Sequence, residues 1–232
     1  MRKHFRPTGI TLSIALFCLS QQGCAPPKES VDKPSIDVVE LTVKNIQQAY
    51  TSGDYTSVDL TQAFLDQINL YEGHYNSFIS MNPNALEIAS TLDQERASGA
   101  IRGPLHGIPV VIKDNIDQKG LVTTAGFSGF SRTTGGIDMI PGDDAAVVER
   151  LLEAGAIILG KTNLPDFAGD GTRTKSSVSG VTLNAYDVTK APGGSSGGTA
   201  TAVNASFAVL GLGTETGGSI QNPAGAQALV GI

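Results

Sequence analysis

Two glycine-rich segments enclose a run of small and apolar residues near the end of the sequence. The first covers residues 192–198 (PGGSSGG) and the second covers residues 213–220 (GTETGGSI). Between them, the small residues of 198–208 predict a helix buried on all sides, and residues 209–212 predict a strand. A flexible linker would not normally run straight into a helix and a strand of this kind. Both segments are therefore expected to be ordered turns with close backbone approaches.

The rest of the sequence alternates between helical and strand patterns. Apolar residues at helical spacing predict three helices, over residues 38–52, 57–73 and 84–97, with Ser57 as a cap of the second. A fourth helix is expected to start at a cap on Asp143 or Asp144 and to end near residue 153. Short apolar runs predict buried strands over 109–112 and 156–159, and residues 163–192 are expected to be mostly irregular. This alternation predicts an α/β fold with a mixed sheet covered by helices.

Composition limits the classes of function. The chain has 232 residues, of which 40% are hydrophobic and 16% charged, as expected for a globular domain. Its isoelectric point of about 5.0 argues against nucleic acid as a partner. The two cysteines, Cys18 and Cys24, both lie near the N-terminus, so the body of the chain offers no disulfide and no cysteine-based metal site. No metal or other cofactor is expected.

The N-terminus has the pattern of a targeting segment. Three basic residues lie within the first six positions, and residues 10–19 form an apolar stretch too short to span a membrane. Gly23-Cys24-Ala25 resembles a lipoprotein cleavage site, at which Cys24 would become the lipidated first residue. A plain secreted form and an uncleaved anchor are the alternatives. We expect a signal peptide over 1–24, a linker over 25–36, a folded domain over 37–232, and export to the cell envelope or periplasm.

Three side chains in or near the glycine-rich segments could together perform acyl transfer. Ser219 follows two glycines, whose backbone N–H groups could bind an oxyanion. Lys113 ends an apolar strand, and burial would lower its pKa enough for the neutral amine to act as a base. Ser195 could pass a proton between them, because a hydroxyl both donates and accepts. Each of these residues also has a structural alternative. Ser219 could cap a glycine-rich turn, Lys113 could be a surface lysine paired with an aspartate, and Ser195 could lie in a flexible loop.

The combination of segments resembles the amidase signature family of serine hydrolases. The resemblance rests on GPLHGIP leading into Lys113-Asp114-Asn115, on GGSSGG around Ser195, on GGS ending at Ser219, and on the GKTN of residues 160–163. It implies that Lys113 is the base, Ser195 the proton relay, and Ser219 the nucleophile that forms an acyl-enzyme. It further implies a cis peptide bond before Ser195, an oxyanion hole and substrate contacts. The residues implied are Thr216, Gly217 and Gly218 for the oxyanion hole, and Gly194 and Ser196 for substrate.

The resemblance runs from about residue 38 to residue 232. Family members continue for roughly as many residues again, which implies that the C-terminal part of the family's sheet and much of the acyl pocket are missing here. We therefore expect poor solubility or no amide turnover from these 232 residues alone. Two positions depart from the family pattern: Glu215 stands where aspartate is common, and Gln221 where arginine is usual.

The leading interpretation is an exported amidase that acts on a small-molecule carboxamide, touches a membrane only through a lipid on Cys24, and has an undetermined oligomeric state. One alternative is a glutaminase-type subunit of a tRNA-dependent amidotransferase, and another is a catalytically silent envelope protein on the same scaffold.

Two other motifs are rejected. Residues 155–162 match a phosphate loop in letters, but the middle of the motif is an apolar strand. Residues 193–197 match a nucleophile elbow, but no histidine follows Ser195.

Overall fold

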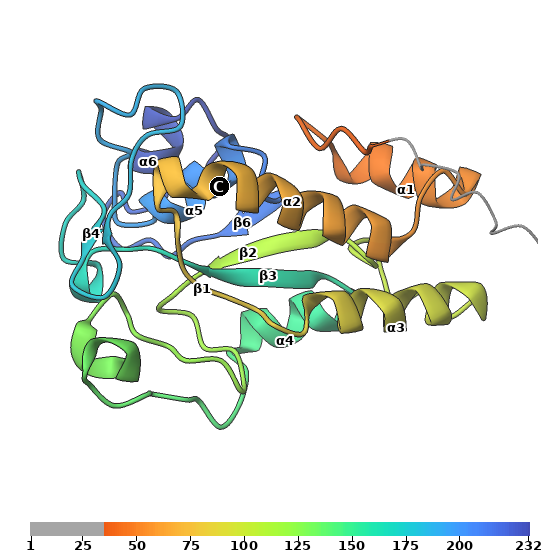
Figure 1. Cartoon of the computed structure of the whole chain (residues 1–232), viewed down its shortest axis with the longest axis horizontal. Helices are drawn as coiled ribbons and strands as arrows, with labels where there is room; N and C mark the ends of the chain where they lie inside the picture. Colours follow the sequence, from red (N-terminus) through yellow and green to blue (C-terminus); the bar gives the residue numbers. More distant parts are fainter. Residues whose placement is uncertain (1–34) are drawn as a thin grey trace, which may run out of the picture. The chain divides into compact units, whose positions relative to one another are not determined.

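A mixed four-stranded sheet in the order β1-β3-β2-β6 organises the described part of the chain, residues 35–232 of a computed structural model (Figure 1). The central pair, β2 and β3, is parallel; β6 is parallel to β2, and β1 is antiparallel to β3. This confirms the predicted α/β class with a mixed sheet. The strands are β1 (Phe78–Met81), β2 (Pro109–Lys113), β3 (Ile157–Thr162) and β6 (Leu210–Leu212).

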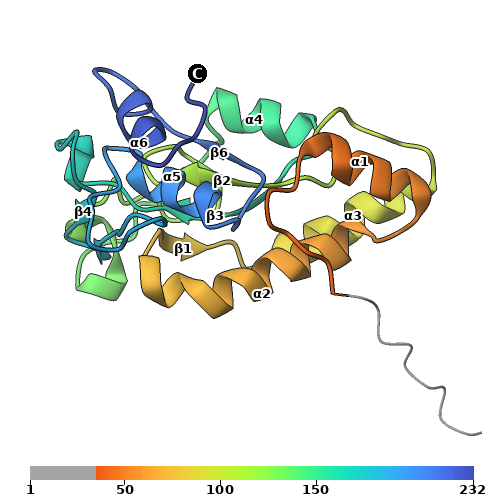
Figure 2. The ribbon, with the colours of Figure 1, turned by 90° about the horizontal axis from the view of Figure 1, so that it is seen from above.

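Helices cover both sides of this sheet. In Figure 1, α2 runs above the strands while α3 and α4 lie below them. Helix α5 packs against β2, β3 and β6, and Figure 2 shows it over the strands from above. The helices are α1 (Val43–Ser52), α2 (Ser57–Tyr75), α3 (Ala85–Ala97), α4 (Ala146–Glu153), α5 (Gly197–Asn204) and α6 (Gln221–Ala226). The remaining elements are short: 3-10 turns at Ser128–Phe130, Arg132–Thr134 and Asp166–Ala168, and the two-stranded pair β4 (Lys175–Ser176) and β5 (Gly180–Val181).

The N-terminal predictions fall outside this part of the chain. The expected signal peptide over residues 1–24, and all but the last two residues of the expected linker over 25–36, lie outside the described residues. Within residues 35–232, no helix combines the length and the apolar character that crossing a membrane requires.

Two predicted helix caps are wrong by one or two residues. Helix α2 is capped by Thr56, whose hydroxyl accepts from the Asp59 N–H, while the Ser57 N–H donates to the side chain of Asp93 at 2.8 Å. Helix α4 is preceded by Ala145 rather than capped by Asp143 or Asp144. The Asp144 carboxylate instead accepts from the Lys119 N–H at 2.6 Å, so this acidic side chain holds a neighbouring loop.

Burial confirms the central strands and distinguishes them from the last strand. Every residue of β2 and β3 is buried, as their apolar sequences predict. The strand predicted over 209–212 is confirmed as β6, which lies at one edge of the sheet and leaves Leu210 42% exposed. Helix α5 is buried over its first six residues, which confirms the small-residue helix.

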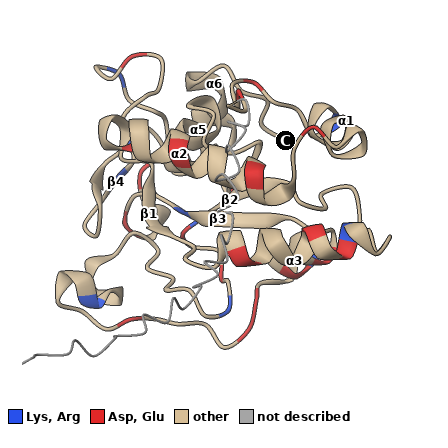
Figure 3. Ribbon diagram, turned by 45° about the vertical axis from the view of Figure 1, so that its right-hand side comes forward, with Lys and Arg blue, Asp and Glu red and all other residues tan. Residues whose placement is uncertain are grey.

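Charged residues are distributed in two contrasting ways. Acidic residues are spread along α2 and α3, the outer helices (Figure 3). By contrast, Lys113, Asp114 and Lys161 lie at the ends of β2 and β3 with no exposed surface. Buried charges are costly unless they are paired or hydrogen-bonded, so these three mark the part of the fold where chemistry is to be sought.

The close approach of α5 to the sheet depends on Gly198. A methyl group at this position would lie 2.4 Å from the Asn163 carbonyl oxygen and 2.7 Å from that of Ser77, both backbone atoms. We expect Gly198→Ala to lower the free energy of unfolding, measured by urea denaturation, by about 1–3 kcal/mol or more. The matched control is Gly73→Ala in α2, where nothing lies within 4 Å of the added methyl group. This control should raise stability by about 0.5–1 kcal/mol, and equal effects at both positions would contradict the packing argument.

Candidate active site

Lys113 is carried into the interior by the strand that it ends. Residues 110–112 of β2 are apolar and buried, and the Lys113 side chain follows them with no exposed surface. Its Nζ donates to Ser195 Oγ at 2.7 Å and to Thr214 Oγ1 at 2.8 Å. Burial lowers the pKa of Lys113 to about 8, against the opposing pull of the Glu215 carboxylate. A substantial fraction of the Lys113 amine is therefore neutral at mildly alkaline pH.

The Ser195 loop takes an unusual backbone path. The Gly194–Ser195 peptide bond is cis, which confirms the expectation from the family resemblance. Gly193 has a φ of +80°, and a methyl group on Gly194 would lie 2.6 Å from the Asp170 carbonyl oxygen. Both glycines are therefore needed for this path. The result is that the Ser195 hydroxyl faces the Lys113 amine at the start of α5.

Ser219 is linked to this pair through the backbone. Its carbonyl oxygen accepts from the Ser196 N–H at 3.0 Å, which ties the second glycine-rich segment to the start of α5. Within residues 35–232 its hydroxyl makes no hydrogen bond to Ser195 or Lys113. The structure thus joins Lys113 and Ser195 directly and attaches Ser219 beside them. The nucleophilic role of Ser219 stays a prediction.

The turn before Ser219 is organised by Glu215. Its carboxylate accepts from the backbone N–H groups of Gly218 and Ile220, and from that of Gln221 at 3.2 Å. These hydrogen bonds, that from Ile220 foremost, lower the pKa of Glu215 and keep it ionised. The Gly218 N–H, one of the donors expected to line an oxyanion hole, is therefore engaged by Glu215 in this structure. Thr216 and Gly217, the other two expected donors, lie on the exposed part of the turn.

Thr214 joins the segments of the site, and the sequence analysis did not single it out. Its hydroxyl receives hydrogen bonds from Lys113 and, at 3.1 Å, from the Asn115 side chain. Its backbone N–H and carbonyl each lie 3.3 Å from Ser196 Oγ. Thr214 lies two residues after the end of β6, and no periodicity indicates where its side chain points, so only the fold reveals this role.

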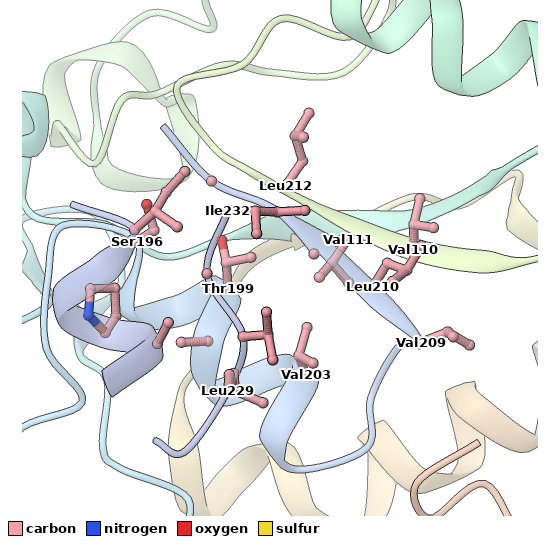
Figure 4. Close-up of a pocket in the computed structure, with 18 of the residues that line it drawn as sticks. Val110, Val111, Ser196, Thr199, Val203, Val209, Leu210, Leu212, Leu229 and Ile232 are labelled. Carbon is pink, nitrogen blue, oxygen red and sulfur yellow. The ribbon is translucent and has the colours of Figure 1, made fainter. Parts of the chain in front are cut away.

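The two residues expected to contact substrate have structural partners. The Ser196 side chain is only 3% exposed and is bonded to Thr214, and Gly194 is buried against the loop at Asp170. Ser196 also lines an apolar pocket of about 460 Å³ beside β6. Figure 4 shows Val111, Leu210 and Leu212 from the sheet, with Thr199 and Val203 from α5. The pocket adjoins the Lys113 site but is not lined by Lys113, Ser195 or Ser219.

The described residues contain no group of three or more His, Cys, Asp or Glu side chains that could hold a metal ion. His106 is buried, and its ring Nε2 lies 2.9 Å from the Leu92 carbonyl oxygen, which gives it a structural role between α3 and β2.

Comparison with known proteins identifies the family. The model of the amidase family matches residues 59–232. Similar sequences include the A subunits of glutamyl-tRNA(Gln) amidotransferases from several bacteria. That of Alkaliphilus metalliredigens is 41% identical over 196 residues, which cover 84% of this chain and 38% of that protein. That of Chloroflexus aurantiacus is 46% identical over 193 residues, covering 83% of this chain and 38% of that protein.

Solved structures agree with the sequence matches. The native peptide amidase of Stenotrophomonas maltophilia aligns with a TM-score of 0.74 and 40% identity, over 80% of this chain and 38% of that one. The chain thus spans 38% of the length of these relatives. The family model matches most of the chain, the relatives are about 40% identical to it, and the fold is shared. This chain therefore belongs to the amidase family.

Proposed function

We propose that the protein is an amidase that hydrolyses a carboxamide through an acyl-enzyme on Ser219. The observation that supports this most strongly is the hydrogen bond between the buried Lys113 amine and the Ser195 hydroxyl. A lysine whose pKa lies near 8 is able to accept a proton at working pH. The Ser195 hydroxyl can transmit that proton from Ser219, whose backbone is bonded to the neighbouring Ser196.

The proposed reaction is an acyl transfer in two steps, acylation of Ser219 and hydrolysis of the resulting ester. In the first step the Ser219 hydroxyl passes its proton to Ser195 Oγ while the Ser195 proton moves to neutral Lys113 Nζ, and Ser219 Oγ attacks the amide carbon. The proton returns along the same path to the leaving nitrogen as the carbon–nitrogen bond breaks. Water then attacks the ester carbon and gives its proton through Ser195 to Lys113. The bond between that carbon and Ser219 Oγ breaks, the proton returns along the same path to Ser219 Oγ, and the carboxylic acid leaves.

Backbone N–H groups of the turn before Ser219 would stabilise the oxyanion. The Ser219 N–H has no protein acceptor within residues 35–232, and the N–H groups of Thr216 and Gly217 likewise have none. The Gly218 N–H would contribute only if Glu215 released it. We therefore assign the main oxyanion contacts to Thr216, Gly217 and Ser219.

Labelling with a fluorophosphonate probe tests the nucleophile and the base without the need for a complete substrate pocket. We expect labelling of Ser219 that is lost in Ser219→Ala and falls by about 100-fold or more in Lys113→Ala. The rate should rise with pH and level off above about 8, because the reactive amine is the neutral form and burial lowers the pKa of Lys113. Ser98→Ala, at an exposed helix end, is the matched control and should label normally. A folded chain that takes up no label would favour a catalytically silent scaffold.

A second candidate function follows from the relatives. Several of them are glutamyl-tRNA(Gln) amidotransferase A subunits at 40–46% identity, which favours glutamine as the amide donor in a larger assembly. The two functions differ in the amide that acylates Ser219. A simple carboxamide or a peptide amide should slow probe labelling by competition if the protein is a free-standing amidase. Protection by glutamine alone would favour the amidotransferase role.

We further propose that the protein is exported and held at the envelope through Cys24, which would separate it from a cytoplasmic amidotransferase. The basic and apolar N-terminal pattern and the Gly23-Cys24-Ala25 sequence support this proposal. In a bacterial host fed a clickable palmitate analogue, we expect the full chain to become labelled and to sediment with membranes. Cys24→Ala should abolish the lipid label, whereas Cys18→Ala should keep it. A chain recovered unlabelled and unprocessed from the cytoplasm would contradict export.

A further inference from the structure

We propose that the side chains of Phe127, Phe130 and Phe167 form an aromatic subsite, which receives an aryl or other bulky apolar group of the amide substrate. The proposal rests on the proposed function, because it names the class of carboxamide on which that same site acts. It places an apolar carboxamide ahead of glutamine as the substrate. Binding to the rings can be measured without any reaction at Ser219, so the two proposals can fail separately.

The three aromatic rings meet where two loops pack together. Phe127 and Phe130 belong to the loop after β2, and Phe167 belongs to the 3-10 turn after β3. The ring centroid of Phe127 lies 5.3 Å from that of Phe130 and 5.2 Å from that of Phe167. The ring centroids of Phe130 and Phe167 are 6.0 Å apart, and these two rings are nearly perpendicular. Each ring therefore lies at a distance typical of aromatic pairs from both of the others.

This aromatic cluster faces solvent rather than the hydrophobic core. Phe167 is 60% exposed, and Phe127 and Phe130 are only partly buried. Ile137 and Met139 are also exposed and follow in the same loop, where the Met139 N–H donates to the Phe130 carbonyl at 3.5 Å. A single exposed apolar side chain is ordinary, but three rings gathered at one place indicate a surface that binds an apolar group.

The backbone holds Phe167 in a conformation that phenylalanine rarely adopts. Its φ of +52° lies in the left-handed region, which favours glycine. Its N–H donates to the Ala125 carbonyl at 2.8 Å, and a methyl group on Gly126 would lie 2.6 Å from the Leu164 carbonyl oxygen. The two loops are therefore closely packed beneath the exposed ring. Unfavourable backbone conformations of this kind occur preferentially at binding and catalytic sites.

The loop that carries Phe167 contacts both glycine-rich segments of the site. Three residues after Phe167, the Asp170 carbonyl oxygen lies against Gly194, the residue before the proposed proton relay. The carbonyl of the next residue, Gly171, accepts a hydrogen bond from the side chain of Asn222, three residues after the proposed nucleophile. A group bound at Phe167 is therefore only a few residues away from both proposed catalytic serines.

The loop that carries Phe127 contacts the end of β2. The N–H of Thr124 donates at 2.9 Å to the carboxylate of Asp114, the residue directly after Lys113. Figures 1 and 2 show this loop, in green, at the end of the molecule that also carries β4 and α6. The aromatic cluster thus lies at the carboxyl end of β2, where the proposed base is found.

The chemistry of the rings selects the occupant. Phenyl rings offer apolar surface and no charge, so they favour an aryl or bulky apolar group. The carboxylate beside Phe167, that of Asp166, already accepts from the Ser177 N–H at 2.7 Å. Free glutamine carries an ammonium and a carboxylate group, which an apolar surface would desolvate without pairing them. An apolar carboxamide is therefore expected to bind at the cluster more tightly than glutamine.

The test follows the binding of phenylacetamide by NMR in the full chain, labelled with ¹³C in its phenylalanine rings and with ¹⁵N in its backbone. Leucine substitutions assign the ring signals of Phe127, Phe130 and Phe167. We expect phenylacetamide to shift these ring signals in a saturable way, together with the backbone signal of Ser219. Acetamide and glutamine at the same concentration should leave the ring signals unchanged, because neither has a bulky apolar group.

Variants of Phe167 measure the contribution of its ring. Phe167→Ala should weaken the binding of phenylacetamide by about three- to tenfold, as expected for the loss of one aromatic contact. Phe167→Leu keeps an apolar side chain and should retain most of the affinity. Tyr71→Ala is the control, because it removes an aromatic ring that is 40% exposed on α2, and it should leave the affinity unchanged.

Three results would overturn the subsite: ring signals that ignore phenylacetamide, an equal response to acetamide, or equal affinity in Phe167→Ala. Each would leave the rings as a packing surface for another polypeptide. Ring shifts without a shift at Ser219 would place the binding surface outside the site and would also reject it. The ¹H–¹⁵N spectrum establishes that each variant is folded, and should Phe167→Ala fail to fold, the comparison of the amides in the unmodified chain decides alone.

A further variant separates this proposal from the acyl-enzyme. Ser219→Ala should bind phenylacetamide as the unmodified chain does. A chain that binds phenylacetamide but takes up no fluorophosphonate label would support the subsite and count against the acyl-enzyme. A chain that is labelled at Ser219 but whose ring signals ignore phenylacetamide would support the acyl-enzyme and reject the subsite.

Discussion

The site depends on one buried amine that is held by hydroxyl groups rather than by a carboxylate. Lys113 contacts Ser195 Oγ and Thr214 Oγ1, and the Thr214 carbonyl oxygen lies 3.4 Å away. A hydroxyl can accept from the ammonium and can equally donate to the neutral amine, so these partners do not strongly favour either form. A carboxylate in direct contact would instead have held the proton on Lys113. The choice of neighbours thus makes a buried lysine suitable as a base.

Three chain segments meet at this amine because of how the turns are built. The end of β2 supplies Lys113, the turn after β6 supplies Thr214, and the start of α5 supplies Ser195. The N–H of Ser196 bonds to the Ser219 carbonyl and its hydroxyl bonds to Thr214, so one residue ties two of these segments together. The carboxyl ends of β2 and β6 lie at one edge of the parallel part of the sheet, where α/β proteins commonly place their sites.

The sequence predicted the parts of this arrangement that depend on local pattern. The apolar strands β2 and β3 and the small-residue helix α5 follow from composition and period, and the cis bond at Ser195 follows from the family motif. Strand β1 was missed because its burial is partial and its pairing with β3 is decided by distant residues. Thr214 and the buried ion pair between Asp114 and Lys161 were missed because the direction of a side chain at the end of a strand depends on the tertiary fold.

Activation of a nucleophile and binding of a substrate place different demands on this chain. The residues proposed for proton transfer lie within the described structure and are largely buried by it. The neighbouring apolar pocket is lined in part by β6, whose outer edge is unpaired within residues 35–232, and by the strongly exposed Val230 and Ile232. The relatives are more than twice as long as the matched region. Reactivity of Ser219 toward a small probe and turnover of an amide are therefore separable properties, because the first needs the Lys113 network and the second also needs a closed pocket.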